Sequence, residues 1–388
     1  MPAFRTSLHS QPIALNSAKS ARKKRRNPPR CAVLAALMVF CIGAHAAPRL
    51  TDFQYIGSHN SYHAGFAPSE AALLKQKNPQ LFAALDYRHP PLTQQLDDGV
   101  RQIELDIFAD AHGGRYAHPA IAEQIAKAGL PPAPPSAPEA VMGAPGFKVM
   151  HVQDVDQRST CQPLIACLRE VRAWSKQHPG HVPIFILLET KQTPLQLDFP
   201  TVQPEPFDAP TMDALDAELR SVFLPGEYLS PDQVRGKAAT LNAAIRSHGW
   251  PSLAQARGKV IFLLDQRSAG DSYLPGHPSL RGRVCFTNAA PGTDDAAFTE
   301  LNDGPAAEIT QLVKAGYLVR TRTDADLHED TQRRDAMLAS GAQLLSTDFP
   351  PHEAASSGYV VRFDGDAVAR CNPQRQPRDH CQSVDLSH

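Results

Sequence analysis

The chain has 388 residues, a formal charge of −1 and almost equal numbers of basic and acidic side chains. This balance argues against a nucleic-acid partner or an acidic tail, because both need a large excess of one charge. A hydrophobic fraction of 42% and a charged fraction of 20% are typical of globular proteins, and 35 prolines predict rigid, irregular loops. No sequence feature points to an obligate protein partner.

Residues 1–46 have the pattern of a signal peptide with an extended basic n-region. A basic run at 22–26 precedes an apolar stretch at 32–42 that is too short to span a bilayer, and Ala44-His45-Ala46 fits a cleavage site. A nuclear or nucleic-acid-binding patch is the alternative interpretation of the basic run, but the apolar stretch behind it favours export. We therefore expect a mature protein that begins near Ala47 and is secreted or periplasmic.

Export would leave five cysteines in an oxidising compartment. Their spacing favours two small disulfide loops, Cys161 with Cys167 and Cys371 with Cys381. Cys285 then stays unpaired, and the apolar run around it predicts a buried thiol rather than a nucleophile. The lack of a Cys-x-x-Cys pair argues against a tetrahedral zinc site.

Eight apolar runs alternate with helical patterns after residue 52, which is typical of βα units and a parallel sheet. The expected strands are 53–58, 102–107, 147–152, 183–189, 259–265, 283–287, 317–323 and 343–347. The clearest expected helices are 163–178, 212–223, 306–315 and 331–340, and Gly316 and Gly341 follow the last two as C-cap glycines. This pattern predicts an α/β fold, a (β/α)₈ TIM barrel, over residues 47–350.

A segment rich in proline and alanine, residues 109–146, interrupts the pattern between the second and third expected strands. On the rim of a barrel such a segment is either an active-site lid or a plain disordered insertion. Residues 351–388 are expected to form a small C-terminal appendage with one disulfide loop.

Polar side chains stand at the ends of the first four expected strands, and the carboxyl ends of barrel strands meet at one face. These residues are His59, Asn60, Glu104, Asp106, His151, Glu189 and Lys191. A single histidine at a strand end most often has a structural role. Four successive strand ends of this kind predict an active site.

These residue types suit metal-assisted phosphodiester cleavage. Three carboxylates and an amide oxygen are a hard, all-oxygen ligand set that favours Ca²⁺, with Mg²⁺ as the alternative, over zinc. A divalent ion would polarise the phosphoryl group and lower the pKa of a nucleophilic hydroxyl. Two imidazoles would then stabilise the charged phosphorane and protonate the leaving oxygen.

Lys191 and Arg320 are weaker candidates for binding the substrate phosphate. Lys191 lies two residues beyond Glu189, on the same side of an extended chain, although a solvated surface lysine fits equally well. Arg320 and Arg322 alternate along the seventh expected strand toward the same rim, where they either contact phosphate or pair with nearby aspartates.

Three further residues have weaker signals. Asp265 and Asp348 end the fifth and eighth expected strands and are expected to orient polar side chains inside the barrel. His63 forms a His-x-x-x-His pair with His59, which on a helix would suggest zinc, but the strand-end position of His59 excludes that geometry.

The motifs Ser-His-Asn-Ser-Tyr at 58–62 and Gly-Val-Arg-Gln-Ile-Glu-Leu-Asp at 99–106, with the His151 strand, resemble the phosphatidylinositol-specific phospholipase C superfamily. The similarity runs from about residue 52 to about residue 350 and is greatest to the secreted, calcium-dependent bacterial branch. In the metal-independent branch an arginine follows the second-strand aspartate. Here Ile107 and Phe108 follow Asp106, which favours a metal.

The resemblance implies a distorted TIM barrel with two catalytic histidines and four Ca²⁺ ligands. The histidines would be His59 and His151, and the ligands Asn60, Glu104, Asp106 and Glu189. It also implies that the inositol 2-hydroxyl of a membrane phospholipid attacks phosphorus and that diacylglycerol leaves. A cyclic inositol phosphate would form first and be hydrolysed later.

Two alternatives stay open at this point. Related barrels with similar histidines and carboxylates act on glycerophosphodiesters or sphingolipids, although glycerophosphodiesterases typically carry His-Arg-Gly where this chain has His-Asn-Ser. The other alternative is a non-catalytic binding barrel, and the presence of both His59 and His151 argues against it.

Overall fold

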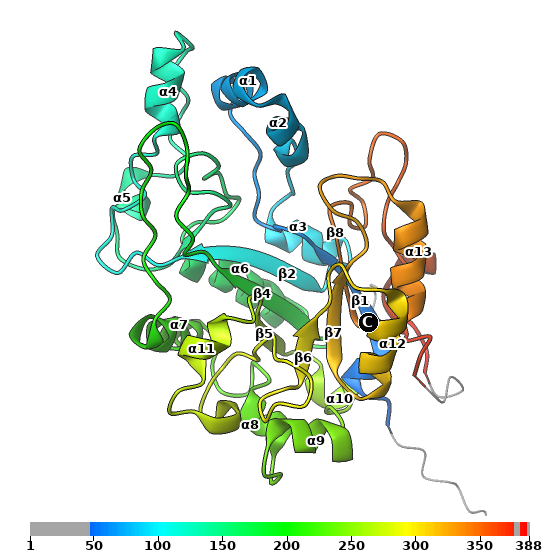
Figure 1. The fold of residues 1–388 in the computed structure, drawn as a ribbon. Helices are drawn as coiled ribbons and strands as arrows, with labels where there is room; N and C mark the ends of the chain where they lie inside the picture. Colours follow the sequence, from blue (N-terminus) through cyan, green and yellow to red (C-terminus); the bar gives the residue numbers. More distant parts are fainter. Residues whose placement is uncertain (1–46, 376–380, 386–388) are drawn as a thin grey trace, which may run out of the picture. The chain divides into compact units, whose positions relative to one another are not determined.

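The computed structural model describes residues 47–375 and 381–385, which belong to one compact unit. The expected signal peptide, residues 1–46, lies outside the described residues. The core of the unit is a curved sheet of parallel strands with helices on its outer face (Figure 1).

Seven strands form the parallel part of the sheet, in the spatial order β5-β4-β2-β1-β8-β7-β6. Their bounds are β1 Phe53–Ser58, β2 Gln102–Phe108, β4 Ile184–Thr190, β5 Val260–Leu264, β6 Phe298–Glu300, β7 Leu318–Arg322 and β8 Leu344–Thr347. Phe286 bridges Leu263 of β5, and Asn288 bridges Phe298 of β6. These two bridges almost close the barrel, so the predicted α/β barrel is confirmed.

The third expected strand, 147–152, is not a barrel strand, and this prediction is wrong. Only β3, Lys148–Val149, is extended, and it pairs antiparallel with the end of β2. Phe147, Val149 and Met150 are buried, which explains the apolar signal. An apolar run does not reveal strand direction. His151 therefore lies on a loop beside the barrel rather than at the end of a parallel strand.

The sixth expected strand, 283–287, is also wrong. The amide groups of Val284 and Cys285 donate to the hydroxyl of Tyr273, at 3.2 and 2.9 Å, instead of to a neighbouring strand. Only Phe286 makes the expected ladder bonds, from its amide to Phe262 and from the Leu264 amide to its carbonyl, each 2.9 Å. The regular strand in this part of the chain is β6, which its three residues made too short to predict.

The four expected helices are all present. They are α6 Leu164–Gln177, α7 Ala209–Val222, α12 Ala306–Lys314 and α13 Thr331–Ser340. Gly341 caps α13 with a φ of 87°, and Gly316, just beyond α12, has a φ of 98°; glycine adopts this left-handed conformation without steric cost. Further helices are α1 Pro68–Lys77, α2 Pro79–Leu85, α3 Leu92–Asp97, α4 Ile121–Lys127, α5 Glu139–Met142, α8 Pro231–Arg235, α9 Leu241–Ser247, α10 Leu253–Ala256 and α11 Ala269–Tyr273.

The proline-rich insertion at 109–146 is ordered. It carries α4 and α5, and Ile121 and Ile125 of α4 form a small core with Leu73 and Leu74 of α1 and with Val155. Figure 1 shows α1, α2 and α4 together beyond one end of the barrel strands. The interpretation as a plain disordered insertion is therefore wrong, and the segment instead supports the loop that follows His151.

Both predicted disulfides are present, with Cα–Cα distances of 5.2 Å for Cys161–Cys167 and 5.8 Å for Cys371–Cys381. Cys285 is a buried free thiol, as expected. The C-terminal strands are β9 Ala367–Cys371 and β10 Val384–Asp385, and β9 pairs antiparallel with the beginning of β1. Across residues 47–375 and 381–385, no helix combines the length and the apolarity needed to cross a membrane.

Candidate active site

Three acidic side chains gather at the carboxyl ends of β2 and β4. Glu104 and Asp106 alternate along β2 and so face the same side of the sheet. Asp106 is the register partner of Glu189 in β4. One carboxylate oxygen from each of the three residues lies within 4.8 Å of the others. The sequence prediction that these three residues meet is consistent with this placement.

Burial makes the charges of this cluster costly. Burial, together with the nearby charge of Glu189, raises the pKa of Asp106 well above its usual value. Lys191 lies 3.1 Å from Oδ2 of Asp106 and 3.1 Å from Oε1 of Glu189, but no well-aligned donor in the described chain reaches either oxygen of Asp106. A cation among these carboxylates would remove much of the repulsion.

Asn60 follows β1 in a left-handed conformation with a φ of 46°, which asparagine tolerates better than most residues. Its Nδ2 donates to the hydroxyl of Tyr87 at 2.7 Å. Its Oδ1 is buried, and none of the described residues donates a hydrogen bond to it. Asn60 therefore keeps a free amide oxygen, which is the atom that a cation would bind.

The residue set fits a hard divalent cation. Asn60 Oδ1 and both oxygens of Asp106 are buried without aligned donors, and the three carboxylates lie within ligand distance of one another. Ca²⁺ takes several oxygen ligands from carboxylates and amides. Asn60, Glu104, Asp106 and Glu189 are therefore the residues that would hold it.

His59 is fixed through both ring nitrogens. Nδ1 donates to Oδ1 of Asp348 at 2.8 Å, and Nε2 accepts a hydrogen bond from Arg322 at 2.6 Å. Burial alone would raise the pKa of Asp348, but the bond from His59 outweighs it and lowers that pKa to about 2. Asp348 is thus an ionised acceptor that holds the proton of His59 on Nδ1. The Nε2 atom of His59 lies 3.6 Å from Oε1 of Glu104.

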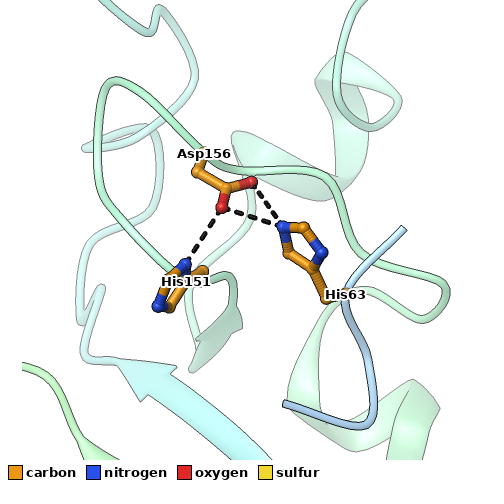
Figure 2. Close-up of side chains that lie close together, drawn as sticks. All are labelled: His63, His151 and Asp156. Carbon is orange, nitrogen blue, oxygen red and sulfur yellow. Dashed lines mark hydrogen bonds and ion pairs between the residues drawn. The ribbon is translucent and has the colours of Figure 1, made fainter. Parts of the chain in front are cut away.

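His151 lies on the loop after β3 and is also held by a carboxylate. Its Nδ1 donates to Oδ2 of Asp156 at 3.0 Å, and the same oxygen lies 2.8 Å from Nε2 of His63 (Figure 2). Burial lowers the pKa of His151 below its usual value, although the bond to Asp156 acts in the opposite direction. Nε2 of His151 is the nitrogen left for proton exchange, and 18% of the side chain is exposed.

Arg320 lies inside the barrel, fully buried, and contacts Glu104. It also donates to Asn302 at 2.8 Å and to Ser346 at 2.9 Å. Burial raises the pKa of Glu104, but the charge of Arg320 outweighs this and lowers it. Arg320 therefore pairs with Glu104 inside the barrel and is not exposed to solvent. Lys191, with 24% of its side chain exposed, is the more accessible of the two cations predicted to bind phosphate.

The predicted residues fall into three sets of contacts. Ion pairs join His59 and Arg320 to Glu104, and Lys191 to Asp106 and Glu189. The three carboxylates bring these two sets within 4.8 Å of each other. In the third set Asn60 contacts Tyr87, whose carbonyl oxygen binds His63, and the ring of His63 lies at a centroid distance of 5.9 Å from that of His151. This third set connects the loop histidine to Asn60, which follows β1.

Sequence reasoning anticipated an orienting role for Asp348 but missed Asp156 and His63. Asp156 follows His151 by five residues in an irregular loop, where spacing carries no geometric information. The His-x-x-x-His spacing suggests His63 only as a zinc ligand on a helix. Only one sequence signal pointed to His63. It is a histidine four residues from His59 with no other predicted role.

Comparison with known proteins identifies the family. A family model described as Phosphoinositide phospholipase C, Ca²⁺-dependent, matches residues 49–373. This match confirms the resemblance seen in the sequence and the Ca²⁺ dependence of the family. No curated protein sequence matches the chain significantly.

Solved structures with a similar fold include two bacterial enzymes. A calcium-dependent phosphoinositol-specific phospholipase C from a Pseudomonas species shares 17% identity, with a TM-score of 0.51 over 81% of this chain and 95% of that one. A Ca²⁺-dependent phosphatidylinositol-specific phospholipase C from Streptomyces antibioticus shares 20% identity, with a TM-score of 0.51 over 78% and 95%. At these identities the structures support the fold, and the family model supports the assignment. The chain therefore belongs to the Ca²⁺-dependent phosphoinositide phospholipase C family of enzymes.

Proposed function

We propose that this enzyme is exported and cleaves phosphatidylinositol, or a closely related inositol phosphodiester, at a membrane surface. The products are diacylglycerol and a cyclic inositol phosphate, which is then hydrolysed to the 1-phosphate. One observation carries the proposal: a carboxylate cluster lies beside His59, and His59 and His151 are each bound through Nδ1 to a different aspartate.

We infer different roles for the two histidines from their hydrogen bonds. His59 has its proton on Nδ1 and a lone pair on Nε2, so it acts as the general base that accepts the proton of the inositol 2-hydroxyl. The hydroxyl oxygen forms a bond to phosphorus while the bond to the glycerol oxygen breaks. His151, protonated on Nε2, donates that proton to the departing oxygen. Hydrolysis of the cyclic product uses the same two groups with reversed roles.

Charged residues around the pair would bind the phosphate. Arg322 already lies beside Nε2 of His59, and Lys191 lies at the mouth of the carboxylate cluster; both suit a phosphate oxygen. Ca²⁺, when bound by Asn60 and the three carboxylates, would supply positive charge that favours ionisation of the attacking hydroxyl.

Export is supported by the signal-peptide pattern of residues 1–46 and by the two disulfides, since disulfides persist mainly in oxidising compartments. N-terminal sequencing of the exported protein tests it. A mature N-terminus near Ala47 is the expected result, and retention of the whole N-terminal segment in the cytoplasm would contradict it.

The substrate proposal is tested by phosphorus NMR of the purified protein with phosphatidylinositol vesicles, in Ca²⁺ and again in EDTA. We expect a cyclic inositol phosphate signal that depends on Ca²⁺. Full turnover in EDTA would contradict the metal assignment. Turnover of glycerophosphoinositol with no action on the lipid would indicate a glycerophosphodiesterase instead.

The assignment of the catalytic pair is tested by His59→Ala and His151→Ala. Loss of a general acid or base should lower kcat by about 10²–10⁴-fold in each variant, with little change in melting temperature. The control is His248→Ala, which alters an exposed histidine at the end of α9. Near-full activity in either site variant would show that the pair is wrong.

A further inference from the structure

His63 and His151 share one carboxylate. Figure 2 shows Asp156 between the two rings. Nε2 of His63 lies 3.0 Å from Oδ1 and 2.8 Å from Oδ2 of Asp156, and Nδ1 of His151 lies 3.0 Å from the same Oδ2. The side chains of His63 and Asp156 are completely buried, whereas 18% of His151 is exposed. Only His151 can therefore meet a substrate.

The hydrogen bonds of His63 define its protonation. Nδ1 lies 2.9 Å from the carbonyl oxygen of Tyr87, which can only accept, so Nδ1 carries a proton. Nε2 faces a carboxylate. Burial would raise the pKa of Asp156, but the bonds from His151 and His63 outweigh burial and keep that pKa below its usual value. Asp156 is thus anionic, and His63 donates from both nitrogens as a buried cation.

We propose that His63 is a positioning residue for His151: as a fixed cation it neutralises Asp156, so that this carboxylate orients His151 without trapping a proton on it. The inference rests on the proposed role of His151 in acid–base catalysis. A group that gives up a proton in one step and recovers it in the next works best when neither form is strongly favoured.

The electrostatic reason lies in the shared oxygen. An uncompensated carboxylate at 3.0 Å would favour the charged form of His151 and raise its pKa. His63 binds the same oxygen and offsets that effect. The other charged group acting on His151 is Lys191, at the end of β4, and its charge also lowers that pKa.

The surroundings of His63 keep it dry and fixed. The ring of Tyr87 lies at a centroid distance of 4.3 Å and that of Phe66 at 6.0 Å. The Tyr87 hydroxyl is occupied by Asn60. Asp156, His151 and Tyr87 are thus the titratable groups that contact the ring of His63.

A metal ion is the competing explanation, because the three side chains offer ligand atoms within 4.8 Å of one another. The geometry points to a proton instead. The distances of 2.8 to 3.0 Å between His63 or His151 and Asp156 are those of hydrogen bonds.

The test is an NMR titration of the His151 imidazole in the complete protein, assigned by comparison with His151→Gln. His63→Gln keeps a polar side chain but removes the cation, so the titration midpoint of His151 should rise by about one pH unit. The basic limb of the kcat profile should move in the same direction. His181→Gln is the matched control, because His181 is also buried and hydrogen-bonded but contacts Ser175 and a backbone carbonyl rather than a carboxylate. An unchanged midpoint in His63→Gln would overturn the proposal, even if the variant were less stable.

A second measurement needs no substitution at His63. Nitrogen-15 shifts of its ring in the wild-type protein, measured at the pH of the activity assay, should show both nitrogens protonated, and a neutral ring would overturn the proposal. Stoichiometric Zn²⁺ in the wild-type protein that is lost in Asp156→Asn would also overturn it. These readouts follow ring protonation and not turnover, so a failure of the phospholipase assignment would be recognised separately, as absence of inositol phosphate release.

Discussion

At the scale of single residues, Asp348 does for His59 what Asp156 does for His151. It accepts the Nδ1 proton of His59 and a second hydrogen bond of 2.9 Å from the Leu327 amide. This fixes the tautomer that leaves Nε2 of His59 unprotonated. A neutral amide at position 348 would no longer select that tautomer.

Asp348→Asn should therefore lower kcat on the order of 10²–10⁴-fold and change the pH dependence of stability. The pKa of Asp348 is about 2 in the folded protein, below its ordinary value of about 4. Its ionised form thus contributes stability that is complete above about pH 4 and is lost as the pH falls through about 2. Melting temperatures measured from pH 6 to pH 2 should show the difference between wild type and variant shrinking in that window. Asp271→Asn, on an exposed side chain, is the control, and a constant difference at all pH values would contradict the assignment.

At the scale of elements, β1 and β2 approach closely where Gly57 faces Gln102. A Cβ atom at position 57 would lie 2.8 Å from Cβ of Gln102 and overlap its amide. Gln102 is completely buried, so its side chain has little room to move. Glycine at this position therefore permits the register that places Glu104 and Asp106 next to the end of β1.

Gly57→Ala should destabilise the protein by about 1–3 kcal/mol through overpacking and lower activity as β2 shifts. Denaturant unfolding followed by circular dichroism measures the first effect. Gly180→Ala is the control, since the added methyl group there meets no atom within 4 Å. Equal stability of the two variants would show that the β1–β2 contact tolerates a side chain.

Arg158 connects the loop of His151 to the elements around it. It donates to both carboxylate oxygens of Glu70 in α1, at 2.6 and 2.9 Å, and to the carbonyl oxygens of Pro134 and Pro135 in the insertion, at 2.5 and 3.3 Å. A planar guanidinium is suited to this number of directed bonds. The side chain is only 16% exposed.

Arg158→Met should lower kcat roughly tenfold, because small displacements of a catalytic group are costly, while the barrel stays folded. Hydrogen exchange should become faster between residues 115 and 160 and stay unchanged in β1, β4 and β5. Arg169→Met, on the exposed face of α6, provides the comparison. Unchanged kcat together with faster exchange would show that His151 is held by Asp156 and His63 alone.

At the scale of the molecule, Ca²⁺ binding should raise the free energy of unfolding of the whole protein. A ligand that binds only the folded protein stabilises it by about 2.7 kcal/mol at one hundred times its dissociation constant. Asp106→Asn should abolish most of this shift. Because burial and Glu189 raise the pKa of Asp106, the same variant in EDTA should be at least as stable as wild type. Glu123→Gln, on exposed α4, should behave as wild type in both conditions. A Ca²⁺ shift that persists in Asp106→Asn would remove that residue from the ligand set.

The sequence predicted the parts of the fold that depend on local pattern. Long apolar runs and amphipathic helices identified β1, β2, β4, β5, β7 and β8 and the four main helices. It could not predict features that depend on contacts between distant parts of the chain. The direction of β3, the use of Tyr273 to bind the amides of 284 and 285, and the three-residue β6 are all set by tertiary contacts.

The same distinction holds for the site. Four predicted metal ligands lie in or just after barrel strands, where alternation along the strand predicts which side chains share a face. They are Asn60, Glu104, Asp106 and Glu189. The prediction for His151 rests on its chemical type and on a strand assignment that is wrong. Asp156 and His63 were missed because their meeting depends on the folding of two irregular loops.

The antiparallel β3 has a consequence for how variants of this enzyme fail. Most of the site is carried by the barrel, but His151 and its partners depend on a loop supported by α1 and the proline-rich insertion. If His151 has the proposed role, damage to that support would lower turnover while the barrel and its carboxylate cluster stay folded. Such variants would then resemble the wild type in expression level and metal content, and a turnover assay would be needed to distinguish them.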